Sequence, residues 1–307
     1  MRRPQDITKE IDFVSLTNLN SDCQRLFHGR GHAYEGFEFI NIDWLSPVIL
    51  ITLYKSAEDA WLSELVDLLI ANVDFFQSIQ VQHRYEKGGP IECLCGEPVS
   101  EAIVSEQGLK FHIQLGKSQN TGLFLDMVNG RDWVRQHAKD KAVLNLFSYT
   151  CAFSVAAMAG GASRVVNIDN NRSVLNKGRD NHKLNLTDFR DVRFEKLDIF
   201  KSYNRIKKYG PYDLLICDPP TFQAGSVDIE RDYRKIITRI PQWMNPGSEI
   251  MLCLNSPDLT DVFIHNVVEE FCPQCQFVKE IKPPLVFKEA MKGKGLKVLL
   301  FSYLPIG

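Results

Sequence analysis

The sequence predicts an α/β protein built on an open, mostly parallel sheet, and three observations predict it. Val143, Leu144, Leu146 and Phe147 form a short apolar run that leaves no room for a polar face, which is typical of a parallel strand buried on both sides. Ser148-Tyr149-Thr150 interrupts the run, and Ala152–Ala159 then reads as a helix that Gly160-Gly161 ends. This unit of strand, polar turn and helix is repeated downstream. In such sheets the helix amino ends and the carboxyl ends of the strands meet at one edge, where nucleotides bind.

Three further strands continue the period, and acidic residues follow them. The strands are expected at Arg164–Ile168, Val192–Glu195 and Tyr212–Cys217, with a helix over Asn170–Asn185. Asp169 ends the first of these strands, where a carboxylate can accept both ribose hydroxyls of an adenosine ligand. Asp198 follows the second strand and is placed to hold an adenine amino group. The third runs directly into Asp218-Pro219-Pro220-Thr221-Phe222.

These features together resemble the class I methyltransferases that depend on S-adenosylmethionine (SAM). More narrowly, Phe147-Ser148-Tyr149-Thr150 with Asp218-Pro219-Pro220-Thr221-Phe222 resembles the bacterial large-subunit (23S) ribosomal RNA base methyltransferases. The resemblance covers Gly108–Tyr303, with a weaker similarity in the N-terminal third. It implies a Rossmann-like sheet of seven strands, in which the last strand lies antiparallel between the fifth and the sixth. A dinucleotide dehydrogenase would instead carry G-x-G-x-x-G in the first turn, which has no glycine here.

The resemblance also implies which residues bind the cofactor. The family element Q-K-T-G-F-F-L-D, which folds over the methionine end of SAM, is matched around Gln119–Asp126, although Asn120 stands at the lysine position. Val128 stands where the family has arginine, with Arg131 a candidate replacement, and Cys151 stands where it usually has glycine. The expected SAM-binding residues are Gln119, Thr121, Phe124, Asp126, Asn145, Ser148, Tyr149, Thr150, Asp169, Asp198 and Asp218.

Methyl transfer needs an acceptor site at the edge of the fourth strand. The resemblance assigns this role to Asp218, Pro219 and Pro220, whose acid and rigid carbonyls hold the surroundings of the target nitrogen, and to Phe222, which could stack on an extruded base. Asn255, after the fifth strand at Glu249–Leu254, resembles the Asn-rich element of the guanine-N7 branch. Guanine N7 has its own lone pair, so it needs neither a thiolate nor a general base.

Cytosine C5 is the alternative acceptor atom, and it requires a cysteine nucleophile. Relatives of that kind carry Ser-Cys-Ser just after the fifth strand. Cys253 lies about one position early, and strand alternation points it away from the corresponding direction. We therefore prefer guanine N7. Cys217, inside the fourth strand, is expected to be buried and inert.

The expected RNA contacts are basic residues outside the sheet. Cys23–His32 interleaves cations with an aromatic side chain and glycines, and Arg25 and Arg30 are its candidates for gripping a phosphate backbone; a solvated loop is the alternative. Lysines outnumber acids between Lys279 and Lys297, which predicts a mobile basic rim with Lys292 and Lys294 as contacts; solubilising lysines are the alternative.

Composition is that of a soluble two-domain protein. The chain has 307 residues, a hydrophobic content of 44% and a formal charge of −2, so any RNA contact must come from local patches. We expect an N-terminal arm over 1–22, an accessory α/β domain over 23–107 and the methyltransferase domain with a leading hairpin over 108–307. No signal peptide, membrane span or metal site is expected, and eight free cysteines indicate the cytoplasm.

Within the accessory domain we expect strands at Phe37–Ile42, Val48–Tyr54, Ser78–His83 and Ile91–Cys95, and a helix that Ser56 caps. Helices are also expected at Val227–Ile240, ended by Pro241, and at Pro257–Phe271, before strands at Phe277–Ile281 and Leu296–Tyr303.

The sequence thus predicts a SAM-dependent RNA base methyltransferase that acts on 23S ribosomal RNA or an assembly intermediate. A protein or small-molecule N-methyltransferase is a further alternative. Cys151, Asn120 and Val128 keep open a non-catalytic RNA-binding scaffold on the same fold.

Overall fold

The computed structural model describes residues 2–16, 18, 21–185, 190–220, 222–223, 227–256, 258–291 and 293–305, with only the main chain at 222, 223 and 227. The chain forms two compact units. The first comprises Met1–Asp126 and Pro284–Lys292, and the second comprises Met127–Pro283 and Gly293–Gly307. This division differs from the predicted boundary after residue 107. The hairpin of β6 (Glu101–Glu106) and β7 (Leu109–Gln114) falls in the first unit, where the Cys23 amide donates to the Ser105 carbonyl (2.7 Å).

The first unit is a five-stranded sheet in the order β1-β2-β3-β4-β5. Its strands are β1 (Gln24–His28), β2 (Ile40–Leu45), β3 (Val48–Leu53), β4 (Ser78–His83) and β5 (Ile91–Gly96). The pairing is antiparallel except between β3 and β4, which α2 (Asp59–Asn72) connects. Alternate residues of β2, β3 and β4 pack with Leu65 and Leu69 of α2, because successive side chains of a strand face opposite sides.

Three local predictions in this unit differ from the structure. The segment expected to be a loose arm contains α1 (Pro4–Thr8) and η1 (Phe13–Ser15), and its Ile7 and Ile11 are buried in the core. The segment expected to be a basic loop begins with β1, whose Leu26 and Phe27 are also core residues. Glu58, not Ser56, is the residue before α2, and its side chain makes no capping hydrogen bond.

The segment Pro284–Lys292 lies between the last two strands of the second unit in sequence, but it belongs to the first unit. Its backbone joins the turn η2 (Gly29–Gly31), because the Ala290 amide donates to the Gly31 carbonyl at 2.7 Å and Glu289 bridges to His32. The Phe287 ring lies 4.9 Å from the Arg25 guanidinium carbon. We call residues 284–291 the strap. The sequence predicted a mobile rim here because its lysines and glycines are typical of an exposed loop and give no sign of the backbone pairing with η2 and His32.

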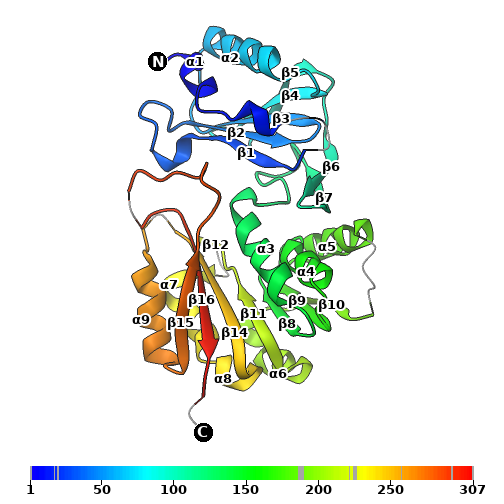
Figure 1. Ribbon diagram of the computed structural model, residues 1–307, viewed down its shortest axis with the longest axis vertical. Coiled ribbons are helices and arrows are strands. Elements are labelled where there is room, and N and C mark those ends of the chain that lie inside the picture. Colours follow the sequence, from blue (N-terminus) through cyan, green and yellow to red (C-terminus); the bar gives the residue numbers. More distant parts are fainter. Residues whose placement is uncertain are drawn as a thin grey trace. The chain divides into compact units, whose positions relative to one another are not determined.

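The second unit is a seven-stranded sheet in the order β10-β9-β8-β11-β14-β16-β15 (Figure 1). Its strands are β8 (Ala142–Leu146), β9 (Arg164–Asp169), β10 (Val192–Lys196), β11 (Tyr212–Cys217), β14 (Met244–Asn255), β15 (Cys275–Ile281) and β16 (Leu296–Tyr303). Only β16 is antiparallel to its neighbours, and it lies between β14 and β15. The predicted fold class and the predicted place of the last strand are confirmed.

Helices cover both faces of this sheet. The helices are α3 (Val128–His137) after η3 (Leu125–Met127), α4 (Ala152–Ala159), α5 (Arg172–Leu184), α6 (Tyr203–Tyr209) after η4 (Ile199–Lys201), α7 (Ile229–Ile237), α8 (Ile240–Trp243) and α9 (Asp261–Phe271). Residues of α3 and α4 pack on one apolar cluster, and residues of α6 to α9 pack on the other. The central strands β8 and β11 are therefore buried on both faces.

Two predicted helices have different bounds. Val227–Ile240 begins with β13 (Val227–Asp228), continues with α7 and ends at the first residue of α8. β13 pairs antiparallel with β12 (Phe222–Gln223), which precedes it in the chain. Pro241 does not end a helix; it lies in the first turn of α8, where its missing N–H costs nothing. The helix expected from Pro257 begins at Asp261.

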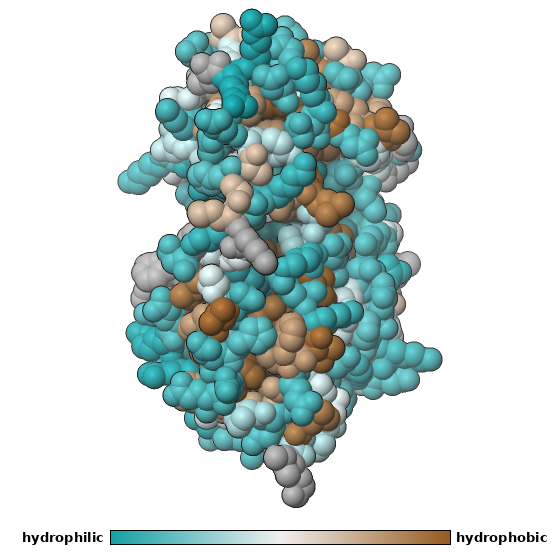
Figure 2. All heavy atoms as spheres, turned by 60° about the vertical axis from the view of Figure 1, so that its left-hand side comes forward, coloured by the Kyte–Doolittle hydropathy of each residue, from teal (hydrophilic) through white to brown (hydrophobic). Residues whose placement is uncertain are grey.

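The outer edge of the sheet exposes apolar side chains. Phe277 and Val278 of the edge strand β15 are 48% and 58% exposed, and Val262 of α9 is 57% exposed. Figure 2 brings this side forward and shows brown apolar atoms among the teal ones of this unit. Among the described residues, no helix has the length and apolarity that crossing a membrane requires.

Candidate active site

The turn between β8 and α4 has the backbone geometry of a glycine-rich loop although it contains no glycine. Phe147, Tyr149 and Cys151 have φ angles of 56°, 47° and 60°. Residues with a Cβ adopt this left-handed region at a cost, which is typical of functional sites that the surrounding structure enforces. Here the Ser148 amide donates to the Ile168 carbonyl (3.0 Å) and the Cys151 amide donates to the Ser148 carbonyl (2.7 Å). The turn is thereby tied to the end of β9.

Cys151, which departs from the family's usual glycine, is accommodated by a glycine on the next helix. The side chain of Cys151 is fully buried, and burial raises the pKa of its thiol. A Cβ atom added to Gly178 of α5 would lie 2.9 Å from the Cys151 Cβ and closer still to its Sγ. Gly178 therefore provides the space that the thiol occupies. The Asn181 amide, one turn further along α5, donates to the Thr150 carbonyl at 3.0 Å.

Asp169, at the end of β9, is held by main-chain amides. Its Oδ2 accepts from the Tyr149 amide (3.0 Å) and its Oδ1 accepts from the Asn171 amide (2.9 Å). Burial raises the pKa of Asp169, while these amide hydrogen bonds oppose the shift because they favour the charged form. A carboxylate oxygen accepts more than one hydrogen bond, so both oxygens keep acceptor capacity for hydroxyl groups of a ligand.

Asn145, predicted to bind the cofactor, belongs to a buried polar network beneath the turn. Its amide donates to Asn167 Oδ1 (2.9 Å), and the Asn167 amide donates to Ser154 Oγ (2.9 Å). Ser154 Oγ lies 2.9 Å from His182 Nε2. Burial lowers the pKa of His182 to about 4. The network joins β8, β9, α4 and α5, and it thereby helps to position the turn between β8 and α4.

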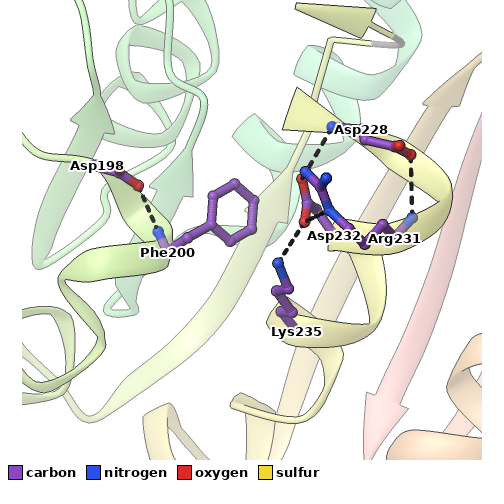
Figure 3. Close-up of polar contacts among 6 residues, drawn as sticks. All are labelled: Asp198, Phe200, Asp228, Arg231, Asp232 and Lys235. Atoms are coloured by element: carbon purple, nitrogen blue, oxygen red, sulfur yellow. Dashed lines mark hydrogen bonds and ion pairs between the residues drawn. The ribbon is translucent and has the colours of Figure 1, made fainter. Parts of the chain in front are cut away.

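Asp198 and the start of α7 form a second group of polar contacts (Figure 3). Asp198 Oδ1 accepts from the Phe200 amide at 3.0 Å. Figure 3 shows Asp232 between the side chains of Arg231 and Lys235, which donate to it at 2.7–2.8 Å and 2.7 Å. These cations lower the pKa of the nearly buried Asp232 carboxyl well below its usual range, the contact with Arg231 contributing most. Sequence reasoning missed Asp232, because its charged neighbours suggest an exposed helix face.

Asp218-Pro219-Pro220 follows β11 directly. The strand holds this turn rigidly, because Leu214–Cys217 pairs with β8 on one side and β14 on the other. Pro219 is buried and Pro220 is exposed. The buried Tyr233 of α7 donates its hydroxyl to the Cys253 carbonyl at 3.0 Å, which ties α7 to β14. Thr221 and the Phe222 side chain, both part of the predicted acceptor motif, lie outside the described residues.

Asn255 is the last residue of β14 and is exposed. The chain after it is held by Lys297 of β16, a side chain that sequence reasoning missed. Lys297 is 2% exposed, and its ammonium donates to the carbonyls of Gly295 (2.8 Å), Leu259 (2.9 Å) and Ser256 (3.5 Å). A buried lysine requires such acceptors. The signal available in the sequence was a single charge inside the apolar strand Leu296–Tyr303.

The cysteines of the site are buried. Cys253 is 0% exposed and packs in the cluster formed with α3 and α4. Cys217 is also 0% exposed, so its expected burial is confirmed, and burial raises the pKa of its thiol. All eight cysteines are free thiols, and no group of His, Cys, Asp and Glu suited to a metal ion occurs among the described residues.

The remaining predicted residues lie in the first unit, in α3 or just before β16. Gln119, Thr121, Phe124 and Asp126 belong to the first unit; Gln119 and Phe124 are exposed, and Thr121 donates its hydroxyl to the Leu123 carbonyl (3.4 Å). The Arg25 side chain is 13% exposed and pairs with Asp43, so its charge is already matched. Arg30 is exposed. Lys294 is partly buried in the second unit, and Lys292 lies outside the described residues. Arg131, the candidate replacement for the missing arginine, is 3% exposed and lies over Phe153.

Comparison with known proteins decides the family. A family model described as S-adenosylmethionine-dependent methyltransferase matches residues 24–302. This chain belongs to that family.

Two similar relatives carry the name Ribosomal RNA large subunit methyltransferase I. The one from Enterobacter sp. (strain 638) is 29% identical over 274 residues, which span 85% of this chain and 68% of the relative. The one from Erwinia tasmaniensis is 26% identical over 306 residues, which span 92% and 76%. Among solved structures, a methyltransferase complexed with S-adenosylhomocysteine superposes with a TM-score of 0.86 at 22% identity, covering 98% of this chain and 82% of that one. The M. jannaschii tRNA m1G37 methyltransferase superposes with a TM-score of 0.64 at 15% identity, covering 87% and 76%. These structures share the fold.

The residues of this methyltransferase fit the cofactor of its family. The Ser148 hydroxyl is buried, and among the described residues it has no hydrogen-bond partner beyond a weak contact with the Cys151 thiol. It is therefore available to a ligand at the turn. Asp169 offers carboxylate acceptors beside it, and the three left-handed residues shape the main chain between them. When bound, SAM supplies a methyl group activated by its sulfonium.

Proposed function

We propose that this methyltransferase modifies a base of large-subunit ribosomal RNA, and that guanine N7 is the acceptor atom. The name of the similar relatives supports the RNA substrate, and Asn255 supports the acceptor atom. Methyl transfer to a nitrogen lone pair is chiefly a problem of alignment, which can contribute about 7–11 kcal/mol when donor and acceptor are held in line. No proton has to be removed from N7 before the transfer.

The proposal gives each side chain at the sheet edge one role. Asp169 binds the ribose hydroxyls of the cofactor, and Asp198 holds the adenine. Asp218 and the two prolines position the target base, while Asn255 donates a hydrogen bond to it from the neighbouring strand. The main chain of Ser148, Tyr149 and Thr150 lies between the cofactor and the target base.

The observation that carries the choice of N7 over C5 is the burial of Cys253. A C5 enzyme needs a thiolate that reaches the pyrimidine ring. Cys253 is fully buried on the α3/α4 side of β14, whereas Asn255 is exposed at the end of the strand. An amide at this position can recognise a purine edge but cannot act as a nucleophile.

The test is methylation of large-subunit ribosomal RNA, purified from a strain that lacks this protein, with radiolabelled SAM and mass spectrometry of the product. We expect N7-methylguanine from the wild-type protein and from Cys253→Ala. We expect a loss of at least tenfold in kcat/KM for Asn255→Ala, equivalent to about 1.4 kcal/mol of transition-state stabilisation. C5-methylcytosine as the product, or abolished activity in Cys253→Ala, would refute the N7 proposal.

Cofactor binding is tested separately by calorimetry, so that a failure of catalysis can be located. Asp169→Asn keeps the shape but removes the charge, and we expect its affinity for SAM to fall by tenfold or more, since hydrogen bonds to charged groups contribute about 1.5–3 kcal/mol. Asp12→Asn is the matched control, because Asp12 caps η1 in the first unit, where its Oδ1 accepts from the Val14 amide at 3.1 Å. Wild-type affinity in Asp169→Asn would exclude the assigned role of this acid.

A further inference from the structure

The first unit fixes one arginine on its surface by a turn that only glycine permits. Arg30 lies between Gly29 and Gly31 in η2. A Cβ on Gly29 would lie 2.5 Å from the Ile40 carbonyl oxygen, and one on Gly31 would lie 2.9 Å from the carbonyl carbon of Lys288 in the strap. The Arg30 amide also donates to Asn41 Oδ1 at 3.3 Å. The backbone at Arg30 is therefore held on both sides, while its side chain is exposed.

Two guanidinium groups share one aromatic ring at this place. The Arg30 guanidinium carbon lies 4.4 Å from the centre of the Tyr54 ring, and that of Arg84 lies 5.6 Å from it. Tyr54 is itself positioned, because its hydroxyl accepts from Asn41 Nδ2 and from Arg84 Nη1, both at 3.4 Å. Arg84 Nη2 also donates to Asn120 Oδ1 at 3.4 Å.

Neither charge is neutralised within the described part of the chain. The ion pairs found there do not involve Arg30 or Arg84, whereas Arg25 pairs with Asp43 and Arg2 pairs with Glu35. Stacking on a ring leaves the in-plane N–H donors of a guanidinium available to another acceptor. Two preorganised and unmatched cations, held against one ring, form a site for an anion.

We propose that Arg30, Tyr54 and Arg84 form a phosphate clamp that binds the backbone of the RNA substrate. This inference rests on the proposed function, from which the RNA is taken. The planar donors of arginine match phosphate oxygens in a bidentate manner, and the order already present in η2 reduces the entropy lost on binding. Asn120 belongs to the arrangement, because its neutral side chain accepts from Arg84, whereas a lysine there would repel the guanidinium.

The clamp is tested with the full-length chain by measuring its affinity for a large-subunit ribosomal RNA fragment between about 50 and 200 mM salt. We expect Arg30→Ala and Arg84→Ala each to weaken binding about tenfold and to reduce the slope of log Kd against log salt by about one. Tyr54→Leu, which removes the ring, is expected to weaken binding similarly. Tyr54→Phe keeps the ring and is expected to remain within about threefold of the wild type.

Arg2→Ala is the matched control, because it removes the same charge from the same unit at a site where Glu35 already neutralises it. We expect it to leave the salt slope unchanged. SAM affinity and the thermal midpoint are measured for every variant, and both should equal the wild-type values. A clamp variant with a lowered thermal midpoint is replaced by Arg30→Gln or Arg84→Gln, which keep side-chain length.

The outcomes separate the clamp from the proposed function. Wild-type protein that binds SAM but no RNA would overturn both. RNA bound and methylated with an unchanged salt slope in Arg30→Ala and Arg84→Ala would overturn the clamp alone. If Arg30→Ala and Arg84→Ala lost binding to an acidic peptide but bound RNA as the wild type does, the site would serve a protein partner. That outcome would also overturn the clamp.

Discussion

The contact between Cys151 and Gly178 predicts a strong coupling between two substitutions. Gly178→Ala in an ordinary helix interior would stabilise a protein by about 1 kcal/mol. Here the new Cβ would lie 2.9 Å from the Cys151 Cβ and closer to its Sγ, well inside the 3.5–4.0 Å of a carbon contact. Overpacking of this kind costs about 1–3 kcal/mol. We therefore expect Gly178→Ala to destabilise the protein by up to about 2 kcal/mol.

Cys151→Gly should reverse that sign. It removes both atoms that the new Cβ meets and leaves the carbonyl carbon of Thr150 at 3.4 Å, an ordinary contact. Alone it should be nearly neutral, because relief of a left-handed residue with a Cβ, about 1–2 kcal/mol, is offset by the lost thiol packing and by the flexibility of glycine. In the protein that carries Cys151→Gly, Gly178→Ala should raise the free energy of unfolding by about 1 kcal/mol.

The assay is urea denaturation of the four proteins in a double-mutant cycle, with SAM affinity measured in parallel. We expect a coupling energy of about 1–3 kcal/mol, the full cost of overpacking. Gly178→Ala alone should also weaken SAM binding, because Asn181 on the displaced helix α5 donates to the Thr150 carbonyl. Thr150 lies in the turn between β8 and α4, which is the proposed SAM site. An equal effect of Gly178→Ala in both backgrounds would refute the packing argument.

Three further predictions concern buried polar groups. Burial lowers the pKa of His182 from about 6.5 to about 4, so the unfolded state binds more protons than the folded state between these two pH values. The free energy of unfolding should therefore fall by on the order of 3 kcal/mol as the pH drops from 6.5 to 4. His182→Gln should reduce this pH dependence, which denaturation curves recorded at each pH would measure. Lys297→Met should lower kcat more than it changes SAM affinity, because the carbonyls of Ser256 and Leu259, just after Asn255, lose their donor. Lys297→Arg should restore part of kcat. Asp232→Asn should destabilise the protein most above pH 4, where the carboxylate that Arg231 and Lys235 contact is charged. The first argument would be contradicted by a pH profile of stability that is unchanged in His182→Gln. The second would be contradicted by an equal effect of Lys297→Met on SAM affinity and on kcat. The third would be contradicted if Asp232→Asn destabilised the protein as much at low pH as above pH 4.

The elements that sequence patterns predicted best are those with one dominant signal. The bounds of β4, α4 and β11 coincide with the predicted ones. β4 alternates apolar and polar residues, β11 is an apolar run, and α4 is a helix between clear interruptions. The strand order followed from the family resemblance. Helix starts near Ser56 and Pro257 were misplaced, since capping residues are common and tertiary packing decides which of them is used. Asp169 was predicted to bind the cofactor from its position alone; that role stays a prediction, and the structure adds the amides that hold its carboxylate.

What sequence patterns could not reveal is compensation between distant positions. Cys151 in place of glycine in the first turn was one reason to keep a non-catalytic scaffold as an alternative, yet Phe147, Tyr149 and Cys151 adopt glycine-like angles. The energy for this comes from partners elsewhere in the chain, namely Asp169 at the Tyr149 amide and Gly178 beside the Cys151 thiol. A position that departs from its family can thus be read correctly only together with the residue that makes room for it.

The strap shows the same principle at the level of domains. Residues 284–291 follow β15 in the chain, yet their main chain fills the space beside Gly31 that a Cβ would need. The turn that presents Arg30 is therefore completed by a segment encoded near the C-terminus. The chain passes between the two units three times, after Asp126, Pro283 and Lys292. A fragment ending at Asp126 would lack the strap, and its Arg30 turn would lose the hydrogen bond from the Ala290 amide. The proposed RNA clamp in the first unit therefore depends on the strap, and we expect a fragment ending at Asp126 to bind RNA more weakly than the full chain.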